Sequence, residues 1–215
     1  TVALTVAKAP LTVTAVNQSR SYGVENPSFS VTFSGFVNGD TSAVVSGAAG
    51  FVTDATPSTH TGTYPIAAGL GTLSAANYRF GDIIDGALTI TKAAQTVTFP
   101  PLLWWAPSPV PSWVALCDLS TINLAATSSG GLPVTLSLGA GSAAALNGTP
   151  GSYSLADIGT TGTGTVTVFA NQAGDDNYEA ATQVDVTFGV MKVVQRVRFI
   201  PPDFKTYGDS PFKIT

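Results

Sequence analysis

Leu11-Thr-Val13-Thr-Ala15 places an apolar side chain at every second position, with a threonine between each pair. Successive side chains of a β-strand point to opposite faces, so this alternation predicts a strand with one apolar face and one polar face. The same alternation recurs at Phe29-Ser-Val31-Thr-Phe33 and at Leu88-Thr-Ile90-Thr91. No stretch of convincing length has the 3.6-residue spacing of an amphipathic helix. The sequence therefore predicts an all-β protein.

Turn-forming residues separate the predicted strands. Clusters of Gly, Asn, Asp and Pro occur at 37–40, 47–50, 130–133 and 173–177. Turn signals recur at roughly the 8 to 12 residue spacing that is typical of a β-sandwich. We therefore predict tandem Ig-like β-sandwich domains.

An internal repeat sets the predicted domain boundaries. Gln95-Thr-Val-Thr-Phe99 is followed by two prolines, and the related Gln195-Arg-Val-Arg-Phe199 lies 100 positions later, again just before a proline pair. We predict a first β-sandwich over residues 1–93, in which 1–7 form an extra leading strand. A second covers 94–191, and 192–215 are the truncated start of a further repeat. A new unit thus begins near each of the two glutamines.

The dipeptide Asn-Tyr occurs at comparable late positions in both units, as Asn77-Tyr78 and Asn177-Tyr178. Each dipeptide precedes the closing strand of its unit. A tyrosine in this position can bury its ring and hydrogen-bond its hydroxyl to nearby backbone.

Composition excludes several classes of partner and chemistry. Nine basic and 13 acidic residues give a net charge of -4, with no Lys/Arg cluster to neutralise a nucleic-acid backbone. No apolar run approaches the roughly 20 residues needed to span a bilayer, so we expect no membrane span in this segment. The first ten residues lack the features of a secretion signal, and we expect the chain to begin within a larger protein. One His and one Cys are too few for a zinc site, so we expect no metal and no cofactor.

No catalytic set can be assembled from the candidate residues. His60 and Cys117 belong to different predicted domains and carry no local nucleophile signature, so His60 is interpreted as a surface-loop residue and Cys117 as a small buried one. Asp82 and Asp85, like Asp175 and Asp176, are interpreted as turn residues, because Asp beside Gly or Asn accepts hydrogen bonds from its own turn. For Asp82 and Asp85 the predicted turn is a hairpin that leads into Leu88. We expect the protein not to be an enzyme.

Specific motifs in residues 8–93 resemble those of a known family. They are Lys8-Ala-Pro-Leu-Thr-Val-Thr-Ala15, Ser21-Tyr-Gly23 with Pro27, Phe33-Ser-Gly-Phe-Val-Asn-Gly-Asp40, Gly62-Thr-Tyr-Pro-Ile66, Ala76-Asn-Tyr78 and Gly86-Ala-Leu-Thr-Ile-Thr-Lys-Ala93. Together they look like the MBG repeat, a bacterial Ig-like module of large surface and adhesin-type proteins. Residues 94–190 resemble the Ig-like repeat that often follows it. The resemblance implies an extracellular, repeat-built rod on the bacterial cell surface.

The segment 100–117 departs from the repeat pattern. It takes 25 positions to pass from Phe99 to Leu124, against 15 from Phe199 to Ile214, and it holds all three tryptophans, with five prolines in twelve positions. We predict an enlarged loop with three alternative roles. It contacts another chain or neighbouring unit, it covers its own sandwich, or it binds a glycan, since large rigid rings lose little entropy on binding.

These patterns predict a structural role without substrate turnover. The predicted function is a structural repeat segment of an extracellular bacterial adhesin or fibre, whose partners are neighbouring repeats or identical subunits joined head to tail by terminal strand addition. The alternative is a carbohydrate-binding or receptor-binding module that uses the Trp loop. The candidate interaction residues are Trp104, Trp105, Trp113, Val197, Phe199, Phe212 and Ile214.

Overall fold

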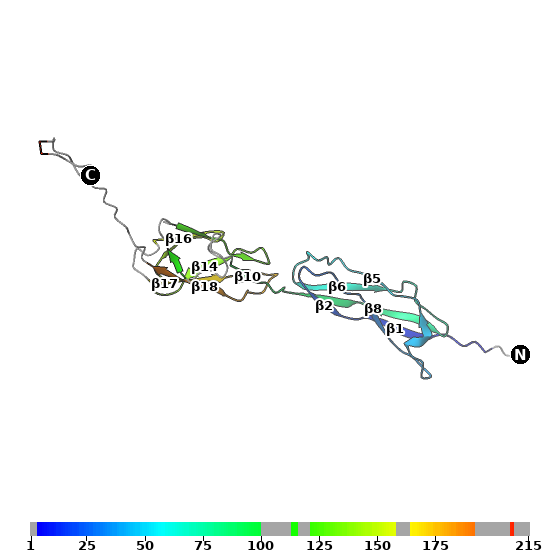
Figure 1. The fold of residues 1–215 in the computed structure, drawn as a ribbon. Helices are drawn as coiled ribbons and strands as arrows, with labels where there is room; N and C mark the ends of the chain where they lie inside the picture. The colour runs from blue at the N-terminus through cyan, green and yellow to red at the C-terminus, as the bar shows by residue number, and fades with distance from the viewer. Residues whose placement is uncertain (1–3, 100–112, 116–120, 158–163, 192–206, 209–215) are drawn as a thin grey trace.

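The structure is a computed structural model that describes residues 4–99, 113–115, 121–157, 164–191 and 207–208. In these residues every extended element is a β-strand, and the one helical element is the short 3-10 helix η1 (Ser42–Val44). Figure 1 shows two groups of strands lying end to end. We call residues 9–91 the first module and residues 97–191 the second module. The predicted all-β class with tandem β-sandwiches is confirmed.

The first module packs one sheet of three strands against one of four. The smaller sheet has the order β3-β1-β8 and the larger has the order β2-β9-β6-β5, with a separate pair β4-β7. Strand β1 contacts β6 and β9 across the sandwich. The strands are β1 (Ala9–Ala15), β2 (Gln18–Ser21), β3 (Val31–Ser34), β4 (Val45–Ser46), β5 (Gly50–Val52), β6 (Gly62–Gly69), β7 (Ser74–Ala75), β8 (Tyr78–Ile84) and β9 (Gly86–Thr91).

Alternation in sequence becomes alternation in burial in this module. Leu11 and Val13 of β1 and Leu88 of β9 are 0% exposed, whereas the threonines between such residues lie toward the surface. The buried core of Ala55, Ile66, Leu88 and Ile90 is extended by the partly buried rings of Tyr22, Phe29, Phe51 and Tyr64. Burial of these side chains, at about 1.5–3 kcal/mol for each large one, is what holds the two sheets together.

The second module has the same layered construction. One sheet has the order β11-β18-β17-β14 and the other β12-β16-β15, with a short pair β10-β13. Its core is larger and includes Leu155, Val166 and Val168, which are 0% exposed. The strands are β10 (Val97–Thr98), β11 (Trp113–Ala115), β12 (Thr121–Leu124), β13 (Thr127–Ser128), β14 (Thr135–Leu138), β15 (Ala145–Thr149), β16 (Ser152–Ala156), β17 (Gly164–Asn171) and β18 (Val184–Met191).

Three local expectations need correction. Residues 4–8 belong to no strand, so the leading strand predicted over 1–7 is not formed at 4–7, and residues 1–3 lie outside the described residues. Within the predicted loop 100–117, Trp113–Ala115 form β11, which pairs in parallel with β18. These three residues follow the last proline of the segment, so their backbone can enter a ladder.

The third correction concerns the segment before β9, which we expected to be a hairpin. Asp82 lies inside β8, and β8 and β9 belong to different sheets. The chain crosses between the sheets at Asp85, whose Oδ1 accepts a hydrogen bond from the Ala68 amide at 2.9 Å. Asp85 therefore stabilises a corner between sheets and not a hairpin turn.

The predicted boundary between residues 93 and 94 falls between β9 and β10, and the predicted domain limits stay predictions. Most of the predicted third repeat, 192–215, lies outside the described residues. No helix among the described residues has the length and apolar character to cross a bilayer.

Candidate functional site

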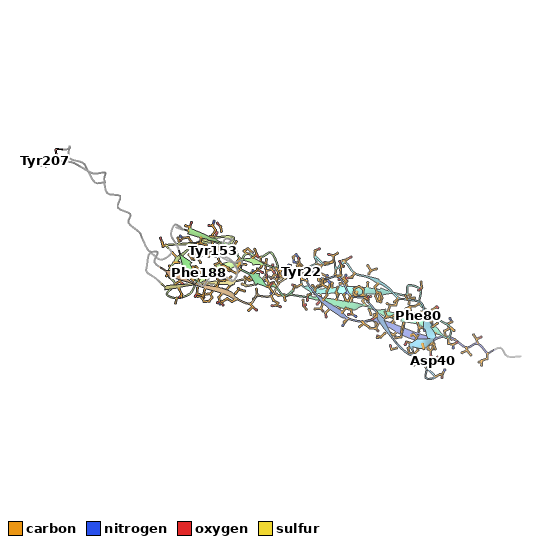
Figure 2. The ribbon with its side chains drawn as sticks, in the orientation of Figure 1. Tyr22, Asp40, Phe80, Tyr153, Phe188 and Tyr207 are labelled. Atoms are coloured by element: carbon orange, nitrogen blue, oxygen red, sulfur yellow. The ribbon has the colours of Figure 1, made fainter. Side chains whose placement is uncertain are left out.

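The site with the most specific contacts is the joint between the two modules. Tyr22 and the loop that carries His60 form its first-module side. In Figure 2, Tyr22 lies at the end of the first module that faces the second. Tyr22 follows β2 directly, and its amide donates to the Thr91 carbonyl at 2.9 Å. The ring of Tyr22 is therefore held beside the last residue of the closing strand.

A buried arginine fixes the loop that carries His60. Arg20 is 7% exposed, and its guanidinium donates to Asn26 Oδ1 at 2.7 Å and to the Thr56 carbonyl at 2.5 Å. The Tyr64 hydroxyl donates to the His60 carbonyl at 3.0 Å at the other end of the loop. A buried cation is tolerated only where its donors are satisfied, and here they are satisfied by loop oxygens. Arg20 thus acts as a positioning residue for the joint.

The second-module side is a tight turn built on Asp175. Its carboxylate accepts hydrogen bonds from the amides of Asn177 and Tyr178, each at 2.8 Å. This is the turn role predicted for Asp175, which is confirmed. Gly174 precedes the turn at φ 79°, and a Cβ there would lie 2.5 Å from the Tyr178 carbonyl oxygen. Only glycine therefore allows the turn to close at this point.

Polar contacts cross the joint through Asn177, which is 8% exposed. Its Oδ1 accepts from the Thr61 amide at 3.3 Å, and its Nδ2 lies 2.8 Å from His60 Nδ1. The Thr61 hydroxyl donates to the Asp176 carbonyl at 2.8 Å. Both ends of the Asn177 amide are thus satisfied by the other module, which fixes the direction in which the two modules meet.

Aromatic packing crosses the joint beside these hydrogen bonds. The rings of Tyr22 and Tyr178 meet edge to face, with centroids 5.5 Å apart and planes at 78°. The ring of Tyr22 also stacks on His60, with centroids 6.3 Å apart and planes at 15°. Edge-to-face pairs are worth about 0.5–1.5 kcal/mol beyond the area that they bury. The joint therefore combines an apolar contact with directed hydrogen bonds.

The linker itself is bonded into the second module. Ala93 donates to the Asn177 carbonyl at 2.9 Å and accepts from the Glu179 amide at 2.9 Å, in a parallel bridge with Tyr178. Lys92 Nζ donates to the Asp175 carbonyl at 2.6 Å. A linker with its backbone paired in this way cannot act as a flexible coil. The geometry favours one fixed orientation between the modules.

The side chains described at the joint contact one another through hydrogen bonds and ring packing. The contacts of the His60 ring are with the Asn177 amide and the Tyr22 ring, and Cys117 lies outside the described residues. Within the described ranges, no group of three or more His, Cys, Asp and Glu is arranged to hold a metal ion. The hydrogen bonds and ring contacts of the joint can position the two modules.

The two Asn-Tyr dipeptides play different roles. Tyr78 is 3% exposed, and its hydroxyl accepts from the Val37 amide at 3.1 Å and donates to Asp40 Oδ2 at 2.7 Å. The predicted buried tyrosine is confirmed there. Tyr178 is only half-buried, and its hydroxyl makes no hydrogen bond within the described structure. Its ring is used at the joint, because Tyr22 of the other module lies against it.

Because Tyr78 is buried, we expect the first module to become less stable at alkaline pH. Burial raises the pKa of Tyr78 above its ordinary value of 10.0, and Asp40 adds to that shift, while the Val37 amide opposes it. A raised pKa in the folded state means that folding favours the neutral phenol. The contribution of that phenol to the free energy of unfolding is therefore intact below pH 10.0, and it is lost as the pH rises through the folded-state pKa. Thermal unfolding of the first module between about pH 8 and 11 should show this loss. Tyr78→Phe should weaken the pH dependence, and an unchanged pH profile would contradict the assignment.

Most predicted interaction residues lie outside the described part of the chain. These are Trp104, Trp105, Val197, Phe199, Phe212 and Ile214. For Trp113 the backbone is placed in β11, opposite Gly189 of β18. The predicted roles of these residues in binding or assembly stay predictions. The joint residues His60, Thr61 and Asn177 were not predicted as a group, and the repeated Asn-Tyr dipeptide was the available signal.

Comparison with known families bears on the first module. Residues 11–89 match the MBG domain (YGX type). The match spans both sheets of the first module and includes Tyr22 and His60 of the joint, so the predicted MBG-type repeat is confirmed for this part of the chain. The resemblance of residues 94–190 to an Ig-like repeat stays a prediction.

Comparisons with whole proteins are more distant. No curated protein matches the chain. Among solved structures, the chain is similar to Protocadherin Gamma B2 extracellular cadherin domains 1-5, with 14% sequence identity and a TM-score of 0.30. That alignment covers 88% of this chain and 39% of the protocadherin chain.

Proposed function

We propose that this chain is a structural repeat segment of an extracellular bacterial adhesin or fibre, in which the MBG-like first module and the second module form a stiff spacer. The joint is the observation that carries the proposal. Its linker is paired through Ala93, and Asn177 bridges the modules through both ends of its amide. A spacer that must present something at a distance gains reach when its joints do not bend. Extension and attachment, without turnover of a substrate, are the proposed task.

The energetics of the array support this role. In repeat proteins, stability is approximately the sum of the terms of each unit and of each interface between neighbours. Here each module has its own buried core, and the joint adds contacts between them. Modules of this type can be added without changing the fold of those already present. Location at the bacterial cell surface belongs to the same proposal and is supported by the MBG match.

The stiffness of the joint can be measured through Asn177. Asn177→Ala removes both cross-module amide contacts, and we expect residual dipolar couplings of the two modules to change from one shared alignment to two independent ones. At about 1 kcal/mol net for each hydrogen bond, loss of two bonds weakens the closed joint by roughly 2 kcal/mol. Asn123→Ala is the matched control, because Asn123 is an exposed strand residue of the same module, away from the joint. Shared alignment that survives Asn177→Ala would argue against the joint as the source of stiffness.

Head-to-tail assembly by terminal strand addition and glycan or receptor binding by the Trp loop remain separate proposals. The first depends on residues 193–215 and the second on Trp104 and Trp105. A spacer function requires neither of them.

A further inference from the structure

The N-terminal arm, residues 4–7, has the sequence of a strand that it does not form here. Ala3-Leu-Thr-Val-Ala-Lys-Ala9 matches Ala87-Leu-Thr-Ile-Thr-Lys-Ala93, with five of seven residues identical and Val in place of Ile. The second sequence is the closing strand β9 together with the linker to the second module. The arm and Lys8-Ala9 therefore have the sequence expected of a closing strand and its linker.

Burial separates the two copies of this sequence. Leu88 and Ile90 of β9 are 0% and 2% exposed in the core of the first module, whereas Leu4 and Val6 of the arm are 89% and 84% exposed. Large apolar side chains spaced two apart along an extended segment have the pattern of a strand face, and here that face has nothing to pack against. Leu4 and Val6 thus correspond in sequence to the two side chains of β9 that are buried in the core of the first module.

The linker contacts are also repeated. Ala9 donates to the Asn77 carbonyl at 3.0 Å, as Ala93 does to the Asn177 carbonyl at 2.9 Å. Ala9 pairs in parallel with Tyr78, as Ala93 does with Tyr178.

The lysines complete the correspondence. Lys8 Nζ donates to the carbonyl two residues before Asn77, that of Ala75, at 3.2 Å. Lys92 Nζ does the same at 2.6 Å to Asp175, two residues before Asn177. The receiving half of a joint is thus already built at the N-terminal end of the first module.

The groups that would meet a preceding module are free in this structure. Asn77 is exposed, and its side-chain amide has no hydrogen-bond partner among the described residues, whereas that of Asn177 binds His60 and Thr61. Beside Asn77 lies a hollow of about 540 Å³, lined in part by Val6, Val37 and Tyr78. Val37 is 47% exposed, and Tyr78 is turned inward against Phe36. The lining is mixed, because Lys8, Asn38 and Asp40 also line the hollow. Its apolar part includes the exposed side chain of Val37, against which an incoming ring can pack, as Tyr22 packs against Tyr178 at the second module.

We propose that the N-terminal end of the first module is the docking surface for a preceding module of the same kind in the same polypeptide, whose closing strand is the arm. The residues equivalent to His60 and Thr61 of that module bind Asn77, and the ring equivalent to Tyr22 enters the hollow beside Val37. This inference rests on the proposed function, because it extends the same joint to a second position.

The test adds the missing module to the full chain. Residues 8–86 are placed directly before residues 3–215, so that Gly86 of the added copy is followed by Ala3 and the arm takes the place of β9. We expect the added copy to fold, and Leu4→Ala in the fused chain to lower its thermal midpoint. In the unfused chain Leu4→Ala should change no unfolding transition, because Leu4 is 89% exposed there. An added copy that stays unfolded, or that is indifferent to Leu4→Ala, would overturn the assignment of the arm.

Docking is read from amide exchange of Thr61, which donates across the joint. In the fused chain we replace Asn77 of the original copy by alanine (Asn77→Ala). The Thr61 amide of the added copy should then exchange about fivefold faster, which is the factor expected for the loss of one hydrogen bond. Thr61 of the original copy, which faces Asn177, is the internal standard. If the Thr61 amide of the added copy exchanged at the same rate with and without Asn77, while Thr61 of the original copy stayed protected, this inference alone would be wrong. An unprotected original Thr61 would count against the proposed function. Loss of self-association in unfused Leu4→Ala would show that the arm enters a second copy and would also overturn the proposal.

Discussion

Leu88→Ala is expected to unfold the first module at a much lower temperature while the second module keeps its own transition. Leu88 is 0% exposed and lies in a small core with Ala55, Ile66 and Ile90. Deleting a buried leucine side chain costs about 2–5 kcal/mol, since the transfer free energy is lost and a cavity is left. For a module of this size that is a drop in midpoint of roughly 10 °C or more. Differential scanning calorimetry should resolve two transitions, of which one moves.

Leu155→Ala is the matched variant for the second module. Leu155 is also 0% exposed, but it lies in the other core. We expect it to lower the second transition and leave the first close to its original midpoint. The joint should produce only a small secondary shift, because Tyr22 contributes both to the first core and to the contact with Tyr178. If both transitions moved equally in both variants, the description of two separate cores would be wrong.

The strands could be predicted from the sequence because they depend on local alternation. Leu11 and Val13 are buried with threonines between them, as a period of two requires. The Asp175 turn and the burial of Tyr78 were equally local inferences, since an Asx turn and a tyrosine before a strand need few residues to define them. The crossing of the chain between sheets at Asp85 was not predicted, because a corner and a hairpin use the same residue types.

The joint could not be predicted because its partners are distant in sequence. His60 and Asn177 are separated by 117 positions, and each is an ordinary loop residue in its own module. Arg20 gave no signal either: its burial depends on the carbonyl oxygen of Thr56, which no side-chain pattern reveals. Contacts of this kind become visible only when the fold places the loops together. The sequence does contain the linker twice, at residues 3–9 and 87–93. This repeat indicates a second joint only once the contacts of Ala93 are known.

Gln95→Ala is expected to weaken the second module and its joint together. Gln95 is 7% exposed, and its Nε2 donates to Gln172 Oε1 at 2.6 Å and to the Glu179 carbonyl at 2.7 Å. Gln172 Oε1 also accepts from the Gly174 amide, so Gln95 holds both sides of the turn that carries Asn177. Losing two hydrogen bonds and leaving a carbonyl without its donor costs about 2–3 kcal/mol. Calorimetry and the exchange of the Thr61 amide measure the two effects.

Gln95→Glu distinguishes loss of the donor from loss of packing. The shape is nearly unchanged, but an ionised carboxylate donates no hydrogen bond and would face the oxygens of Gln172 and Glu179. At neutral pH this variant should therefore be destabilised at least as much as Gln95→Ala. Protonation of the new carboxyl group restores one donor, so its deficit should shrink as the pH falls toward about 4, near the ordinary pKa of a glutamic acid. The Gln95 Oε1 atom has no partner in the described structure, which leaves the donor end of the amide as the part that matters. Stability of Gln95→Glu equal to that of the parent chain at neutral pH would show that packing alone accounts for Gln95.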